Sequence, residues 1–304
     1  MAVETLSHGQ LTWTNLINPT AADTKQLAQA YPQFHPLDLE DLLSHIERPK
    51  IDEYDTYLFI VMQFPVWDRD RRLSRSSEVD IFVGSGFVVT AHAGDLKPLV
   101  NLFSECQNEA AARNTKMSSA GRLLHAIIDG LVDYIFPILH RVDQNIRGIE
   151  EVMFVEDTRQ TLQTMSFVRR DIIALRRIIR PQVSIISNLE QVDRPYIKEN
   201  LDVYFGDILD HVQKARDIVE DDADVIAGLA DTSDALASHR INEVMRILTV
   251  ISVIMLPLTL ISGILGMNIP LPLAKAPYTF WGTMGVMLLI TTGMLLYFRH
   301  RNWL

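Results

Sequence analysis

Two stretches near the C-terminus carry no charged side chain. The first runs from Ile247 to Leu265 and the second from Pro277 to Phe298, which is 19 and 22 residues. At about 1.5 Å per helical residue, each stretch covers the thickness of the hydrocarbon core of a bilayer. A buried core helix is usually shorter and keeps a polar face. The pattern therefore predicts two membrane-spanning helices, 247–265 and 277–298.

The first 112 residues show the shorter patterns that are typical of strands and short helices. Two stretches rich in β-branched and aromatic residues, Thr56–Phe64 and Glu78–Ala93, are separated by a charged turn, DRDRRLSRSS. The stretch HPLDLEDLLSHIERPK (His35–Lys50) predicts a helix. Residues 1–112 are therefore predicted to form a mixed α/β domain.

Residues 113–200 show a hydrophobic period of 3.6 instead. Two long amphipathic segments, 123–154 and 161–189, predict a pair of helices that form a hairpin. The second segment is basic, and a solvated helix face explains its arginines as well as any specific role does.

A repeat of seven residues marks the segment 201–265. No proline occurs between Asp207 and Pro257, so one stalk helix is expected to continue into the first membrane span. One row of the repeat consists of Asp210, Asp217, Asp224, Asp231, Ser238, Met245, Ser252, Thr259 and Gly266. A second row consists of Asn242, Thr249, Leu256 and Gly263. A strict period of seven keeps each row on one narrow stripe of a slowly supercoiling helix.

The polar stripe predicts a water-filled path. Polar side chains in a membrane helix nearly always face a bundle interior or an aqueous cavity, although Ser252, Thr259 and Gly263 also suit close helix packing. The acidic extension favours the aqueous path, because stacked aspartates repel one another in a dry seam but attract cations around a wide vestibule. One span cannot enclose a pore, so several copies are expected around one axis.

Charged residues at the ends of the spans indicate the topology. Arg240 and Arg246 precede the first span, Arg299 and Arg301 follow the second, and the connecting loop carries only Lys275. By the positive-inside rule both ends lie in the cytosol, and the N-terminus shows no signal peptide. We therefore expect a multi-pass protein of the inner (plasma) membrane, with both termini cytoplasmic and a basic tail at 299–304.

The sequence shows no signature of catalysis or of nucleotide binding. It contains no GxxxxGK[ST] loop and no recognisable pair of nucleophile and base. Its one cysteine, Cys106, excludes an intrachain disulfide. We expect neither an enzyme nor an organic cofactor nor a nucleic-acid partner.

An uncharged turn, Gly266-Met267-Asn268, opens the predicted extracellular loop 266–276 between the two spans. The carbonyl of Gly266 and the side-chain amide oxygen of Asn268 are neutral hydrogen-bond acceptors. Mg²⁺ sheds its water reluctantly, so its first hydration shell presents hydrogens to acceptors of this kind. A ring of such oxygens would hold the hydrated ion without stripping it.

These motifs resemble the CorA family of divalent-cation channels, whose members end in two spans joined by a Gly-Met-Asn loop. The resemblance is carried by Asn242–Asn268 and the terminal YFRHRNWL, and upstream by His35–Lys50, IIDGLVDYIF and YFGDILDH. It implies a funnel-shaped homopentamer in which an α+β cytosolic domain with long helices precedes two C-terminal transmembrane helices. It also implies passive uptake of Mg²⁺ and Co²⁺, with Mg²⁺ acting both as transported ion and as regulator.

The resemblance further implies roles for individual residues. Gly266, Met267 and Asn268 would form the selectivity filter. The resemblance and the seven-residue rows together predict a pore lined by Asn242, Met245, Leu248, Thr249, Ser252, Leu256, Thr259 and Gly263, and the resemblance makes Met245, Leu248 and Leu256 its apolar constrictions. Regulatory cations would bind at subunit interfaces to Glu40, Asp41, Asp129, Asp207 and His211. Acids that face one another across an interface destabilise it until a cation neutralises them, so closure is expected to follow intracellular Mg²⁺.

The loop departs from the family pattern at one point. Many members carry an acid after the motif, whereas IPLPLAKAPYT has Lys275 and no acid. Zinc-transporting relatives also lack this acid, so a Zn²⁺ transporter of the same superfamily, with or without proton coupling, is the alternative. A membrane-anchored cytosolic scaffold or sensor is a third hypothesis, and the polar stripe argues against it.

Overall fold

The computed structural model describes residues 3–44, 47–153, 158–191, 201–267 and 278–303. The chain divides into two compact units, Met1–Ala230 and Asp231–Leu304. We call them the N-terminal and the C-terminal unit. Helix α8 (Asp202–Leu265) contributes residues to both.

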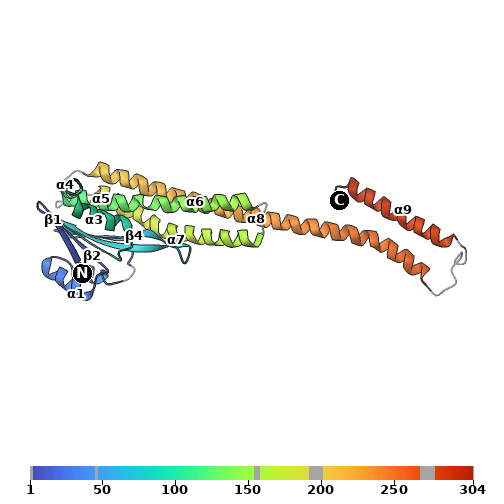
Figure 1. Ribbon diagram of the computed structural model, residues 1–304, viewed down its shortest axis with the longest axis horizontal. Helices are drawn as coiled ribbons and strands as arrows, with labels where there is room; N and C mark the ends of the chain where they lie inside the picture. The colour runs from blue at the N-terminus through green and yellow to red at the C-terminus, as the bar shows by residue number, and fades with distance from the viewer. Residues whose placement is uncertain (1–2, 45–46, 154–157, 192–200, 268–277, 304) are drawn as a thin grey trace. The chain divides into compact units, whose positions relative to one another are not determined.

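The described residues of the N-terminal unit form one six-stranded sheet (Figure 1). Its strands are β1 (Val3–His8), β2 (Leu11–Ile17), β3 (Lys50–Glu53), β4 (Tyr57–Asp68), β5 (Leu73–Gly84) and β6 (Phe87–His92). They lie in the order β1-β2-β6-β5-β4-β3, and neighbours are antiparallel except for the parallel pair of β2 and β6. The sheet therefore places chain segments from both ends of the first 92 residues side by side.

The sheet corrects two details of the sequence analysis. The stretch Glu78–Ala93 is two strands, because Gly86 adopts φ 84 and allows a tight turn between β5 and β6. The charged turn between β4 and β5 is also shorter than predicted. Only residues 69–72 connect the strands, and Leu73–Ser77 already pair with β4.

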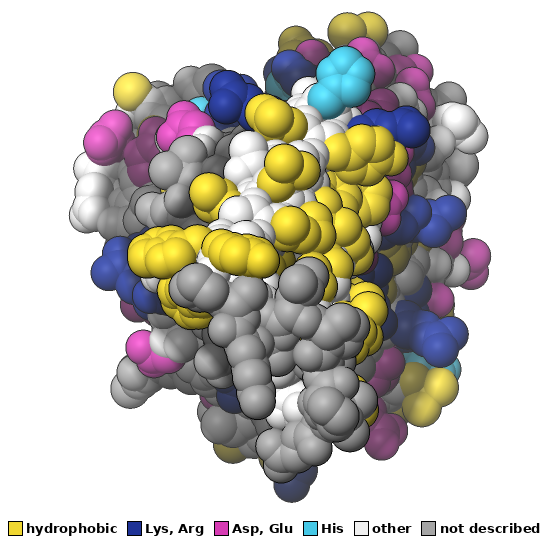
Figure 2. Space-filling view, turned by 90° about the vertical axis from the view of Figure 1, so that its right-hand side faces the viewer, with side chains coloured by type: hydrophobic (Ala, Val, Ile, Leu, Met, Phe, Trp, Pro, Cys, Tyr) yellow, Lys and Arg dark blue, Asp and Glu magenta, His cyan; other side chains and the backbone are white. Residues whose placement is uncertain are grey.

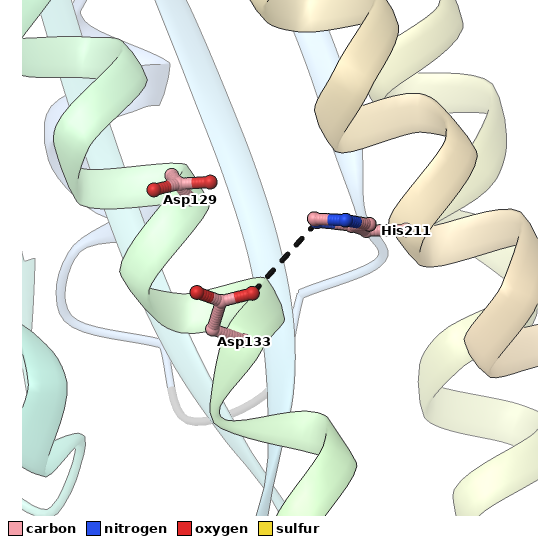
Figure 3. Close-up of side chains that lie close together, drawn as sticks. All are labelled: Asp129, Asp133 and His211. Atoms are coloured by element: carbon pink, nitrogen blue, oxygen red, sulfur yellow. Dashed lines mark ion pairs between the residues drawn. The ribbon is translucent and has the colours of Figure 1, made fainter.

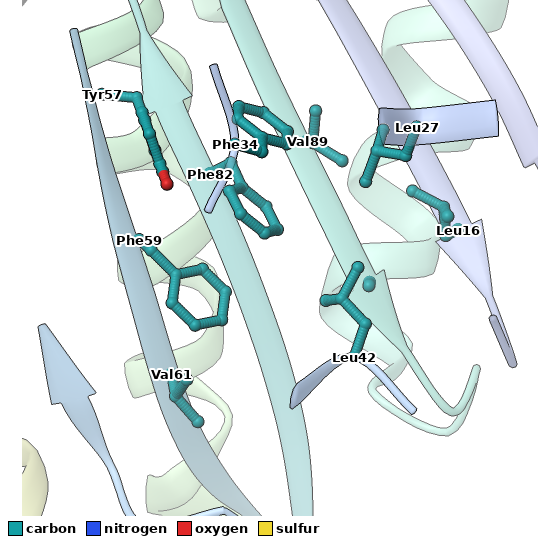
Figure 4. Close-up of a cluster of buried hydrophobic side chains, with 10 residues drawn as sticks. Leu16, Leu27, Phe34, Leu42, Tyr57, Phe59, Val61, Phe82 and Val89 are labelled. Carbon is teal, nitrogen blue, oxygen red and sulfur yellow. The ribbon is translucent and has the colours of Figure 1, made fainter. Parts of the chain in front are cut away.

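One face of the sheet is covered by α1 (Ala21–Ala30) and α2 (Pro36–Asp41). Phe34, between these helices, stacks on Phe82 of β5 with ring centroids 4.2 Å apart, within a cluster of buried side chains (Figure 4). The helix predicted over His35–Lys50 is thus much shorter. Leu42 enters the core and Lys50 joins β3, so tertiary packing outweighs the local helix propensity.

The opposite face of the sheet is covered by helices. They are α3 (Lys97–Asn108), α5 (Ala120–Asp133), α6 (Ile135–Val152) and α7 (Thr158–Gln191), and α4 (Ala110–Lys116) packs beside them against α3 and α5. Trp13 of β2 packs edge-on against Phe103 of α3, with ring centroids 4.8 Å apart. Neighbouring residues of β4, such as Phe59 and Ile60, point to opposite faces and are both fully buried. The continuous apolar pattern of β4 follows from this double coverage.

The amphipathic segment 123–154 contains a helix boundary that its periodicity does not reveal. Helix α5 ends at Asp133 and α6 begins at Ile135, so Pro137 falls in the first turn of α6. Proline is tolerated there because the first amide groups of a helix have no partner within the helix. Helices α6 and α7 pack against each other.

The part of α8 within the N-terminal unit buries one stripe of side chains. Its period is also seven, in two rows: Ile208, Ala215, Asp222 and Leu229, and Val212, Val219 and Ile226. Asp210 lies about midway between Ile208 and Val212 in sequence, so at 100° per residue it projects from the opposite side of the helix. The acidic row is accordingly exposed in this chain.

The C-terminal unit consists of the rest of α8 and of α9 (Thr279–His300). Large hydrophobic side chains of both helices are exposed, and Figure 2 shows such side chains gathered on one face. Among the described residues, three helical stretches have the length and composition to cross a membrane: Ala120–Val152, Asp202–Leu265 and Thr279–His300. Half of the apolar window in the first is buried inside the structure, whereas the windows in α8 and α9 are 6% and 0% buried. The two predicted spans are therefore apolar helices whose side chains are almost entirely unburied in this chain.

Candidate cation site and pore-lining residues

Three side chains with metal-binding groups meet between α5 and α8. Asp129 and Asp133 lie four residues apart on α5, so they share one face of the helix, and His211 reaches them from α8 (Figure 3). One ligand atom from each of the three lies within 4.8 Å of the others. Nδ1 of His211 lies 3.8 Å from Oδ1 of Asp133.

The electrostatics of this cluster favour a cation. Burial raises the pKa of Asp129, and the neighbouring charge of Asp133 raises it further. Nδ1 of His211 is buried and accepts or donates no hydrogen bond within the described part of the chain. A divalent cation between these groups would neutralise the two carboxylates and give the imidazole nitrogen a partner.

The donor set limits which ions suit the cluster. Carboxylate oxygens are the ligands that Mg²⁺ prefers, whereas imidazole suits Zn²⁺ and other first-row transition metals. Two carboxylates and one imidazole therefore fit either a partly hydrated Mg²⁺ or a transition-metal ion.

The structure brings together some of the predicted regulatory residues and not others. Asp129 and His211 share the cluster, and Asp207 lies one helical turn before His211 on α8, near enough for its charge to raise the pKa of Asp129. Glu40 and Asp41 lie on α2, away from the cluster. Within this chain, Asp41 already has a cationic partner, because Nζ of Lys50 lies 2.7 Å from its Oδ2.

Asp133 is a member of the cluster that the sequence analysis missed. The spacing could have identified it, because in the stretch IIDGLVDY this aspartate follows Asp129 by four residues and therefore shares its helix face. Which helix that face would meet could not be read from the sequence.

The acidic vestibule residues, Asp210, Asp217, Asp224 and Asp231, are all exposed on α8. One of them has a cationic neighbour in the same chain: Nη2 of Arg216 lies 2.7 Å from Oδ1 of Asp217. Arg216 therefore offsets part of the negative charge of the row at Asp217.

The hydroxyl groups along the apolar part of α8 bond to their own helix. Thr249 donates to the carbonyl of Met245 at 2.7 Å, Ser252 to that of Leu248 at 2.8 Å. Thr259 donates in the same way to the carbonyl three residues earlier, at 2.9 Å. With its hydrogen satisfied, each hydroxyl presents an oxygen outward, which reduces the cost of a polar side chain in a membrane and leaves an acceptor for water or a cation.

Three apolar residues among those predicted to line the pore are largely exposed on α8. Met245, Leu248 and Leu256 are 56%, 53% and 70% exposed. Helix α8 ends at Leu265, and the amide of Gly266 donates to the carbonyl of Ser262 at 2.9 Å. Asn268 and Lys275 lie outside the described residues. The exposed seven-residue row on α8 thus extends to Gly266, the first residue of the Gly-Met-Asn turn.

These apolar helices and the carboxylate-imidazole cluster are features of a membrane protein that transports cations. A family model described as "CorA-like Mg2+ transporter protein" matches residues 8–300. The chain belongs to this CorA family, whose members are transporters of divalent cations rather than enzymes, and Mg²⁺ is an ion that the family transports.

Relatives and a solved structure agree with this assignment. The chain is 32% identical over 293 residues to "Putative metal ion transporter YfjQ" of Bacillus subtilis, covering 96% of this chain and 89% of the relative. It is 30% identical over 296 residues to the cobalt/magnesium transport protein CorA of Thermotoga maritima, covering 96% and 83%. The complete structure of the CorA magnesium transporter from Methanocaldococcus jannaschii matches with a TM-score of 0.85 at 20% identity, over 98% of this chain and 94% of that chain. The predicted family and fold class, an α+β domain with long helices and two C-terminal apolar helices, are confirmed.

Proposed function

We propose that this protein is a homopentameric channel for passive, potential-driven influx of divalent cations, chiefly Mg²⁺ and also Co²⁺. The observation that carries the proposal is the exposed row on α8, which is acidic at its start, hydroxyl-bearing in the apolar part, and continuous as far as Gly266. A row of this kind is stable in a bilayer when copies of the helix surround water. A membrane potential of 100 mV, negative inside, supplies about 4–5 kcal/mol per divalent ion.

The pore-lining positions have different roles at different levels of α8. Asp210, Asp217, Asp224 and Asp231 concentrate cations in the cytosolic vestibule. Rings of Met245, Leu248 and Leu256 form apolar constrictions that exclude water when they are narrow. Asn242, Thr249, Ser252, Thr259 and Gly263 line the path between and beyond these rings.

Selection takes place at the ring of Gly266, Met267 and Asn268. Neutral oxygens there bond to the water shell of the ion, so the ion enters without paying for dehydration. Carboxylates would hold it more tightly and slow its release, which conduction disfavours.

Gating depends on acids at the subunit interfaces. Asp129, Asp133, Asp207 and His211 form one half of each regulatory site, and Glu40 with Asp41 on α2 forms the half that the neighbouring subunit supplies. High intracellular Mg²⁺ joins the halves and holds the constrictions narrow. When Mg²⁺ is low, the acids repel one another, the subunits separate, and the pore fills with water.

A Zn²⁺ transporter, with or without proton coupling, is the second candidate. His211 favours it, because imidazole is a common Zn²⁺ ligand, and so does the absence of an acid from the sequence that follows Asn268. Arg240, Arg246, Arg299 and Arg301 support the same topology for either ion, with both termini in the cytoplasm and the spans in the inner (plasma) membrane.

Ion uptake by the purified protein in liposomes tests the proposal. We expect potential-driven Mg²⁺ uptake that needs no proton gradient, and we expect Asn268→Ala and Asn268→Asp each to abolish it. Asn101→Ala is the matched control, because Asn101 is an exposed asparagine on α3, outside the pore. Normal uptake by either Asn268 variant refutes the filter, whereas Zn²⁺ uptake that requires a proton gradient favours the second candidate.

A further inference from the structure

A cleft of about 630 Å³ lies in the N-terminal unit, between the β4–β5 turn and helices α6 and α7. The turn and the adjoining strand contribute Trp67, Arg69 and Arg72. Arg141 lines the cleft from α6, and Phe167 with Asp171 lines it from α7. No residue of the cation site or of the predicted pore is among its lining residues.

The side chains of the cleft carry an excess of positive charge. Its lining contains three arginines, Arg69, Arg72 and Arg141, and one acidic residue, Asp171. Asp171 is 3% exposed, and its carboxylate accepts a hydrogen bond of 2.6 Å from the amide of Ser74. Within the described residues, Arg69 and Arg72 form no ion pair. The cleft therefore suits an anion with more than one negative group.

Arg141 adds a buried donor that needs a partner. Its guanidinium lies over the ring of Trp67, 4.7 Å from the ring centroid, which holds it in place. Nη1 of Arg141 is buried and has no hydrogen-bond partner within the described part of the chain. A buried guanidinium N–H without an acceptor is unfavourable, and an anionic ligand would supply the acceptor.

The backbone conformation of the turn allows the side chain of Arg72 to be tested separately. Arg72 adopts φ 49, the left-handed conformation that favours glycine. Its neighbour Arg71 lies 3.8 Å from the carboxylate of Asp68 and does not line the cleft. Arg72→Gly therefore removes the guanidinium without straining the turn.

We propose that this cleft binds a nucleoside polyphosphate. Guanidinium forks match phosphate oxygens, so Arg69, Arg72 and Arg141 bind the phosphates. Phe167, which is 42% exposed, provides apolar ring surface for the base, and the volume is within the range of cavities that bind small organic ligands. The sequence has no glycine-rich phosphate loop, and the arginines take its place. This site is independent of the proposed transport.

Equilibrium dialysis of labelled ATP against the full-length protein, in detergent with EDTA, tests the proposal without any contribution from bound metal. We expect saturable binding of about one ATP per chain. Arg72→Gly and Arg69→Gln should each weaken it by about tenfold or more, because each removes a charge-assisted contact. Arg71→Gln is the matched control and should bind ATP as the parent does. Arg72→Gly should unfold at the same temperature as the parent or higher, which excludes misfolding as the cause of lost binding.

Competition identifies which part of the ligand is recognised. We expect unlabelled ATP to compete better than inorganic pyrophosphate, and pyrophosphate better than adenosine. Absence of saturable binding at millimolar ATP would overturn the proposal, as would equal losses in all three arginine variants. Pyrophosphate that competes as well as ATP would show that the cleft recognises phosphate without the nucleoside, which also overturns it.

Discussion

Replacing Asp222 with asparagine is expected to stabilise the protein at neutral pH and to remove part of the pH dependence of its stability. Asp222 lies in the buried stripe of α8, in a row with Ile208, Ala215 and Leu229. It is 9% exposed, and its Oδ2 has no hydrogen-bond partner within the described residues. Burial raises its pKa from 3.8 to about 6, and the nearby carboxylates of Asp143 and Asp221 add to the shift.

The sign of the effect follows from proton binding. Between about pH 4 and pH 6 the folded protein keeps the proton of Asp222, whereas the unfolded chain releases it. The free energy of unfolding therefore falls as the pH rises through this window, and the full destabilisation by the ionised Asp222 is present above about pH 7. At about 1.4 kcal/mol per pKa unit, the cost of the ionised carboxylate is roughly 3 kcal/mol at most.

Thermal unfolding of the full-length protein in detergent, followed from pH 4.5 to 8 with chelator present, measures this contribution. We expect the variant to gain on the parent as the pH rises, with a difference between Tm values that grows by roughly 5–10 °C across the range. Asp234→Asn, an exposed aspartate on the same helix, is the control and should show a constant difference from the parent. Parallel curves for the parent and Asp222→Asn would refute the reasoning, because they would mean that the carboxyl group does not change its protonation on folding.

Three further predictions concern assembly and regulation. Asp207→Asn should need a higher Mg²⁺ concentration to protect the cytosolic domain from proteolysis. Asp207→Lys should be protected without metal, because lysine supplies the positive charge itself. Superimposable protease titrations of the parent and both variants would show that Asp207 is only a surface acid. Asp133→Asn should weaken binding of Co²⁺ by about tenfold in calorimetry of the chelator-stripped protein, since one charged ligand is lost, and an unchanged isotherm would remove Asp133 from the site. Native mass spectrometry in mild detergent should show one homo-oligomer, a pentamer, and a monomer or dimer as the sole species would contradict the shared pore.

The features that depend on composition and spacing along one segment were determined by the sequence itself. The stretch Ile247–Leu265 is uncharged over the length of a bilayer, and the seven-residue row on α8 follows from counting positions along an unbroken helix. The family motifs, including the Gly-Met-Asn turn, are contiguous as well. Helical and membrane-spanning character are local properties, so they can be read without knowing what surrounds the segment.

The features that require two distant segments to meet were decided by the tertiary structure. Asp133 becomes a candidate ligand only because α8 places His211 beside α5, and Arg72 meets Arg141 only because the β4–β5 turn packs against α6 and α7. In the sequence, Asp222 cannot be distinguished from the other acids of this helix, and only the packing of α8 shows that it is buried. Burial and proximity depend on how the elements pack, and no local pattern encodes which faces will meet.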